Sequence, residues 1–288
     1  MRPPSSVPEI VADKACRLGA SPVWQPALGL FYWIDASTGS LFSYNPAAGK
    51  AANVPTEDKV SACAACADES ILLLGNKLSF LQNGKVFTVE LPWRSGSQFE
   101  ALAVDRQGRL VCAARLTGSK SSQLCWIQAD GRMGEVLTNV GRVSSLAFDP
   151  PGSFLYCCHA GSREVARFEY NSETSRASAR DVIAVIPASL GTSNGLAVDA
   201  KGFLWVAIWG GSCVLRMSPA GKEDQRIYFT AGLLSGLAFG GKELRDLYVV
   251  SSGAQDRKAN GPGAGALFRL RPGVRGAATS LVQRQLLY

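Results

Sequence analysis

The chain has 288 residues, of which 47% are hydrophobic and 18% are charged, so it can bury a large core and does not have the composition of a disordered protein. Its formal net charge is +7, but the lysines and arginines are scattered without a dense basic run. This pattern indicates a solvated basic surface and no nucleic-acid partner. Because no unbroken apolar segment approaches the ~18 residues of a membrane helix, and the N-terminus has no apolar signal core, we expect a cytoplasmic protein without a membrane partner.

The eight cysteines do not predict a metal or redox centre. Cys63 and Cys66 form a C-x-x-C pair, and Cys157 and Cys158 are adjacent. No second C-x-x-C follows at the spacing of a zinc site, and the surroundings of the first pair are rich in alanine. We therefore expect buried, reduced thiols.

One theme recurs along the chain: an apolar alternating strand, a turn containing Asp or Gly, and a second strand rich in β-branched and aromatic residues. The spacing between successive units is roughly 40 to 50 residues, which is typical of a four-stranded propeller blade, and almost no stretch keeps a helical period. The fold predicted is an all-β, six-bladed β-propeller around a central channel, forming a single domain over residues 1–288. The repeated units lie at residues 29–50, 65–85, 99–115, 143–171, 194–222 and 235–252, with a further strand at 265–272.

A propeller needs its two chain ends to close the ring, since closure removes exposed sheet edges. A short strand around Glu9–Ala12 is expected at one end. The last residues, LVQRQLLY (281–288), form the other candidate strand. We expect these two segments to pair within one blade.

Several of these units together resemble a known family. They are LGASPVW (18–24), FYWIDASTGSLFSYNPAAGK (31–50), NGLAVDAKGFLWVAIWGG (194–211), LAFGGKELRDLYVVSS (237–252) and GAGALFRL (263–270). In this order they are similar to the senescence-marker/gluconolactonase/luciferin-regenerating-enzyme family. The resemblance implies a six-bladed propeller with one divalent cation, often calcium or zinc, in its central pocket. It also implies an activity that opens a lactone or related ester with metal-activated water.

The positions that the resemblance assigns to the cation carry different side chains in this sequence. Ala20 stands where the family has Glu, Ser144 where it has Asn, and Asn194 where it has Asp. None of the three is a carboxylate, and affinity for a divalent cation falls with the number of charged ligands. No metal ligand or cofactor is therefore expected at these positions, although a weak or rearranged calcium or zinc site remains open.

Two residues are candidates for acid or base catalysis. Glu100 replaces an Asn of the family pattern, and we expect its carboxylate to lie in the pocket without a strong partner. His159 is the only histidine and has an unperturbed pKa near neutrality. The alternative is that Glu100 is only a loop charge and that His159 is a structural residue. Asn194, Ser144, Trp209 and Gln98 are the candidate substrate-binding residues.

Two functions follow from this pattern. The first is a divergent pocket enzyme that acts on a small molecule, by hydrolysis of a lactone or ester or by a cyclisation or isomerisation. The alternative is a catalytically inactive propeller retained as a ligand-binding or assembly subunit, because fold alone does not set function. We favour the enzyme. The sequence sets neither the substrate nor the oligomeric state.

Overall fold

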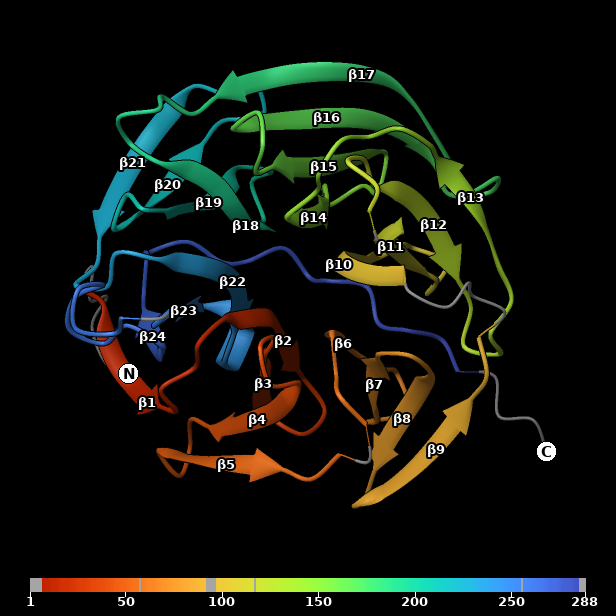
Figure 1. Ribbon diagram of the computed structural model, residues 1–288, viewed down its shortest axis with the longest axis horizontal. Helices are drawn as coiled ribbons and strands as arrows, with labels where there is room; N and C mark the ends of the chain where they lie inside the picture. Colours follow the sequence, from red (N-terminus) through yellow and green to blue (C-terminus); the bar gives the residue numbers. More distant parts are fainter. Residues whose placement is uncertain (1–6, 57, 92–96, 117, 255, 285–288) are drawn as a thin grey trace.

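The computed structural model describes residues 7–56, 58–91, 97–116, 118–254 and 256–284. In these ranges the chain forms six four-stranded antiparallel sheets and a single short 3-10 helix, η1 (Lys242–Leu244). The sheets are arranged as blades around a central axis (Figure 1). The prediction of a six-bladed β-propeller is confirmed.

Five blades each use four consecutive strands, with the first strand innermost. The first blade contains β2 (Gly19–Gln25), β3 (Leu30–Asp35), β4 (Ser40–Asn45) and β5 (Lys50–Val54). The second contains β6 (Ala62–Ala65), β7 (Ile71–Leu74), β8 (Leu78–Gln82) and β9 (Lys85–Val89). The third contains β10 (Ser97–Val104), β11 (Leu110–Leu116), β12 (Gln123–Ile127) and β13 (Met133–Leu137). The fourth contains β14 (Ser145–Phe148), β15 (Phe154–His159), β16 (Glu164–Asn171) and β17 (Arg176–Val185). The fifth contains β18 (Thr192–Val198), β19 (Leu204–Trp209), β20 (Cys213–Met217) and β21 (Glu223–Tyr228).

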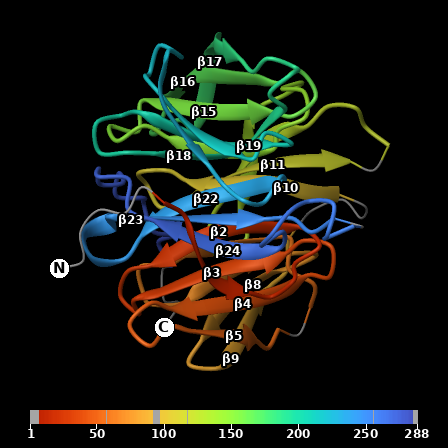
Figure 2. The ribbon, with the colours of Figure 1, turned by 90° about the vertical axis from the view of Figure 1, so that its left-hand side faces the viewer.

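The sixth blade joins the two ends of the chain. It contains β22 (Leu234–Gly240), β23 (Asp246–Ser251) and β24 (Ala266–Leu270), with β1 (Glu9–Asp13) as its outer strand. Figure 2 turns the ring so that this blade faces the viewer. The expected N-terminal closing strand is therefore confirmed.

The expected partner of that strand is wrong. β1 pairs with β24, where Arg269 Nε donates to Glu9 Oε1 at 2.8 Å. The segment 281–288 forms no strand within its described part, and its last four residues lie outside the described ranges. Val282 makes instead an isolated bridge to Cys66. The backbone groups on the outer edge of β24 are free to pair with β1, because the inner edge of β24 is already paired with β23.

The recurring Asp-x-x-Gly stretches form the turns between the first two strands of a blade. After β18, Asp199 Oδ1 accepts the N–H groups of Lys201 at 2.9 Å and Phe203 at 3.1 Å. Gly202 follows with a φ of 80°, a left-handed conformation that favours glycine. Asp105 and Asp149 make the same kind of side-chain contact in their own turns.

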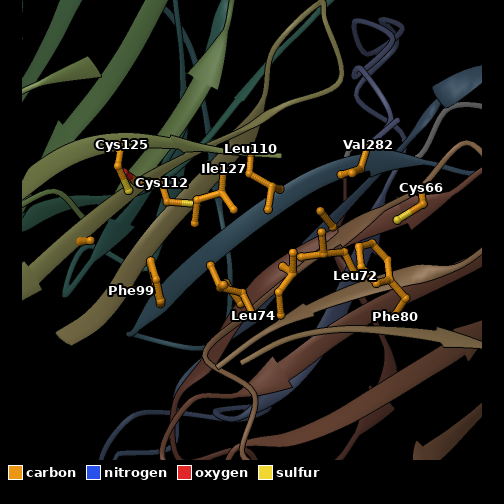
Figure 3. Close-up of a cluster of buried hydrophobic side chains, with 14 residues drawn as sticks. Cys66, Leu72, Leu74, Phe80, Phe99, Leu110, Cys112, Cys125, Ile127 and Val282 are labelled. Carbon is orange, nitrogen blue, oxygen red and sulfur yellow. The ribbon is translucent and has the colours of Figure 1, made fainter. Parts of the chain in front are cut away.

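The blades are held together by apolar side chains that pack face to face. Figure 3 shows one such cluster, in which Leu72 and Phe80 of the second blade lie opposite Phe99 and Leu110 of the third. All eight cysteines are buried and free. Burial raises the pKa of the Cys63 thiol to about 12, which makes thiolate chemistry unfavourable at neutral pH. The expectation that the thiols are buried is confirmed.

The two ends of the channel differ. At the end where the inner strands begin, serine hydroxyls connect neighbouring blades: Ser144 Oγ donates to Ser193 O at 3.2 Å and Ser235 Oγ to Gly19 O at 2.6 Å. At the other end the C-terminal segment (residues 271–284) crosses the ring, as the blue trace in Figure 1 shows. Ala277 N donates to Val198 O and Val282 N to Ala65 O, both at 2.9 Å. We call the end where the inner strands begin the open end, because the C-terminal segment crosses the other one.

No helix in the described ranges is long and apolar enough to cross a membrane.

Candidate functional site

The first residues of the inner strands pair irregularly with the second strands of their blades. Pairing registers shift within β2, β10, β18 and β22, close to the first residues of each strand. Such β-bulges leave a residue outside the ladder and turn its side chain, and they are common beside active sites. The residues skipped by three of these shifts are Glu100, Asn194 and Ser235.

Glu100 is held by a network of donors. Arg115 Nε lies 2.6 Å from Glu100 Oε1, and Ser122 Oγ donates to Glu100 Oε2 at 2.7 Å. A second guanidinium group, that of Arg142, lies 3.6 Å from Oε1. The Glu100 side chain is 13% exposed. The expectation of a carboxylate without a strong partner is wrong, because β11 places Arg115 directly opposite Gln98 in β10.

Gln98 takes part in the same network. Its Oε1 accepts a hydrogen bond from Arg115 Nη2 at 2.9 Å, and its side chain is exposed. The Gln98 amide therefore helps to orient the guanidinium group that holds Glu100.

Asn194 lies inside strand β18, between Ser193 and Gly195, rather than in a hairpin turn. It is half-buried. Ser144 precedes β14, and its Oγ also lies 3.2 Å from Cys158 O. Since Ser144 Oγ bonds the carbonyl of Ser193, the residue next to Asn194, these two candidate positions are neighbours across the fourth and fifth blades.

Trp209 is the last residue of β19 and is half-buried. Its Cα partner is Thr192, the first residue of β18, so the indole belongs to the same end of the fifth blade as Asn194. An indole at this position can supply an apolar wall to a bound ligand.

His159 ends β15 and is 3% exposed. The imidazole interacts with the backbone of Arg142, while its Nε2 is buried without a hydrogen-bond partner. Burial lowers the pKa of His159 below its usual value, and the charge of Arg180 lowers it further, whereas Glu164 opposes the shift. A buried, neutral imidazole is not placed to touch a ligand in the channel, but it packs against the main chain that carries Arg142.

Two functional candidates were not found from the sequence. Arg115 and Arg142 both approach Glu100, from the second strand of the same blade and from the segment that leads into β14. The available signal for Arg115 was a single arginine in the otherwise apolar strand 110–116. No sequence pattern marks Arg142, because its side chain comes close to Glu100 only when the third and fourth blades are packed together.

Comparison with known proteins identifies the family. Residues 18–253 match the model of the SMP-30/Gluconolactonase/LRE-like region. The chain belongs to this family. Pentonolactonase XacC from Haloferax volcanii is 32% identical over 275 residues, which cover 90% of this chain and 92% of that protein.

Solved structures in the family share the fold. A calcium-binding protein, regucalcin, from Agrobacterium tumefaciens superposes with a TM-score of 0.85 at 20% identity, covering 96% of this chain and 97% of that one. Luciferin-regenerating enzyme gives the same TM-score and identity, covering 96% and 99%.

The family pattern implies a divalent cation held by the residues at positions 20, 144 and 194. Ala20 has no oxygen donor, and Ser144 Oγ is engaged with two main-chain carbonyls. Asn194 offers a neutral amide, and the nearby carboxylate of Glu100 is paired with Arg115. No cluster of three His, Cys, Asp or Glu side chains suited to a metal ion occurs among the described residues. These positions therefore do not fit a divalent cation held by charged ligands.

Proposed function

We propose that the protein hydrolyses a small sugar lactone at the open end of the channel. The observation that carries this proposal is the presentation of a carboxylate, a hydroxyl and an amide by three consecutive blades, in Glu100, Ser144 and Asn194. Membership of a family that includes a pentonolactonase 32% identical to this chain supports the reaction class.

Glu100 acts in this proposal as the acid and base. Its Oε2 accepts one hydrogen bond from Ser122 and keeps a second lone pair, which can take a proton from water. The water oxygen bonds to the lactone carbonyl carbon as its proton moves to Glu100. The bond from this carbon to the ring oxygen then breaks, and the proton passes from Glu100 to that oxygen. The product is a hydroxy acid, which ionises in water.

The remaining candidates bind and position the substrate. The Asn194 amide has both donor and acceptor groups, which suit sugar hydroxyls, and Trp209 supplies an apolar surface. Gln98 and Arg115 hold the Glu100 carboxylate in place. His159 acts through its contact with the Arg142 backbone and is a positioning residue.

The test is a panel of five- and six-membered sugar lactones, assayed by proton release and corrected for spontaneous hydrolysis. We expect turnover by the wild-type protein. Glu100→Gln should lower kcat by ~100-fold, the scale of a positioned acid or base. Asn194→Ala should raise KM more than it lowers kcat, because a neutral amide orients the substrate. Equal turnover in wild type and Glu100→Gln would contradict the role of Glu100.

A second candidate function is a ligand-binding propeller without turnover. The observation that favours it is the loss of every charged side chain from the inherited positions Ala20, Ser144 and Asn194. Calorimetric titration with the lactones and their hydroxy acids separates the two. Binding without turnover of any lactone would support this candidate over the hydrolase.

A further inference from the structure

Two arginine side chains lie beside the Glu100 carboxylate. The guanidinium groups of Arg115 and Arg142 lie 2.6 Å and 3.6 Å from Glu100 Oε1. Two guanidinium groups against one carboxylate leave this cluster with a formal charge of +1. The residues at the inherited cation positions, Ala20, Ser144 and Asn194, add no charge to this cluster.

The opening of a lactone is favoured by a positive charge close to the carbonyl oxygen. Negative charge develops on the carbonyl oxygen when water adds to the carbonyl carbon, and preorganised donors at that oxygen often make the largest single contribution to catalysis. Because Ala20, Ser144 and Asn194 do not fit a cation, the reaction requires another electrophile. A guanidinium group provides fixed charge and a fork of N–H donors that matches carboxylate geometry.

The two arginines are not equivalent. Arg115 is 17% exposed, and its Nε, Nη1 and Nη2 donate to Glu100, to the carbonyl of Ser119 and to Gln98. Arg142 is 61% exposed, and its approach to Glu100 is longer than a hydrogen bond. Arg115 is therefore committed to holding Glu100, whereas Arg142 has donors available for a ligand.

Arg142 is also placed beside the candidate substrate residues. It lies two residues before Ser144, whose hydroxyl reaches the carbonyl of Ser193 next to Asn194. Its main chain packs against the buried ring of His159, which fixes the base of the side chain while the guanidinium group remains exposed.

We propose that Arg142 serves as the electrophile of a lactonase that works without a metal ion, binding the carbonyl oxygen during water addition and the carboxylate of the product. This inference rests on the proposed function, and it adds the group that replaces the family cation. The proton transfers remain those assigned to Glu100.

The experiment compares metal-stripped protein with protein supplemented with calcium, zinc or manganese. We expect kcat on the best lactone of the panel to agree within about twofold between these samples. Arg142→Gln should lower kcat/KM by ~100-fold or more, as loss of an oxyanion donor does, and Arg142→Lys should recover part of it. The matched control is Arg132→Gln, an exposed arginine in the turn between the two outer strands of the third blade, which should keep wild-type kinetics.

A second measurement does not depend on turnover. Calorimetric titration with the hydroxy-acid product, in the presence of a chelator, should give an affinity at least tenfold weaker for Arg142→Gln than for Arg132→Gln. Loss of activity on chelation with recovery on adding a metal would overturn the inference and leave the lactonase function standing. Wild-type kinetics and product affinity in Arg142→Gln would also overturn it. Failure of every lactone to turn over, with and without metal, would overturn the proposed function and the inference with it.

Discussion

Replacement of Glu100 by Gln is expected to reduce stability as well as activity. The substitution keeps the shape of the side chain and removes its charge. It weakens the 2.6 Å contact with Arg115, in which both side chains are mostly buried, at 17% and 13% exposure. A hydrogen bond to a charged group contributes about 1.5–3 kcal/mol, and breaking a fully buried ion pair costs about 3–5 kcal/mol.

The lower range applies to this pair. Arg115 keeps its contacts with Gln98 and Ser119 after the substitution, and the remaining exposure lets water solvate the guanidinium group. We therefore expect Glu100→Gln to lower the free energy of unfolding by about 2 kcal/mol. A domain of this size loses about 2–4 °C of Tm for each kcal/mol, so Tm should fall by ~4–8 °C.

The assay is urea unfolding followed by circular dichroism, applied as a double-mutant cycle with Arg115→Gln. If the ion pair forms as described, the two single changes should be coupled by at least ~1 kcal/mol. Glu135→Gln is the matched control, because Glu135 pairs with Arg176 at 3.1 Å while both side chains are more than half exposed. That change should cost less than about 1 kcal/mol. Equal effects of Glu100→Gln and Glu135→Gln, with no coupling to Arg115, would refute the reasoning.

Three further predictions concern pH, calcium and a buried ion pair. Because the pKa of His159 is lowered in the folded state, its contribution to stability is present above about pH 6.5 and is lost as the pH falls toward the folded pKa. The urea midpoint of the wild type should drop more between pH 7.5 and 5.5 than that of His159→Asn; equal drops would contradict this. Ala20→Glu combined with Asn194→Asp should restore carboxylates to the family positions and raise Tm by on the order of 5 °C in saturating calcium, whereas the wild type should shift little in the same thermal melt. Arg216→Met should lower the free energy of unfolding by about 3–5 kcal/mol in urea titration, since it removes two donors, at 2.7 and 2.9 Å, from the fully buried carboxylate of Asp199; a loss below about 1 kcal/mol would contradict it.

The propeller could be predicted from the sequence because its signals are local and repeated. Each blade carries its own alternating strands, and turns such as the one at Asp199 are encoded within five residues. The pairing of β1 was harder to predict, since two C-terminal segments had suitable apolar patterns and the choice depends on which strand edge remains free in the assembled sheet.

The electrostatics of the site could not be predicted in the same way. The sequence identified the position of Glu100 but not its partners, because Arg142 approaches it from another blade. Burial of His159 likewise depends on how the segment around Gly141 and Arg142 covers the end of β15. Contacts of this kind arise from packing between blades, for which the local pattern carries no signal.

Because β1 pairs with β24, the sixth blade can be completed only after β24 has been synthesised. Glu9 leaves the ribosome 260 residues before its partner Arg269. Arg284, which pairs with Asp68, is later still. Until Arg269 emerges, the sixth blade has β22 and β23 but lacks β24, so β1 has no strand to pair with and the ring is not closed. Such non-local pairing slows folding and exposes sheet edges to aggregation, so a ribosome stalled before residue 266 releases a chain that cannot complete its ring.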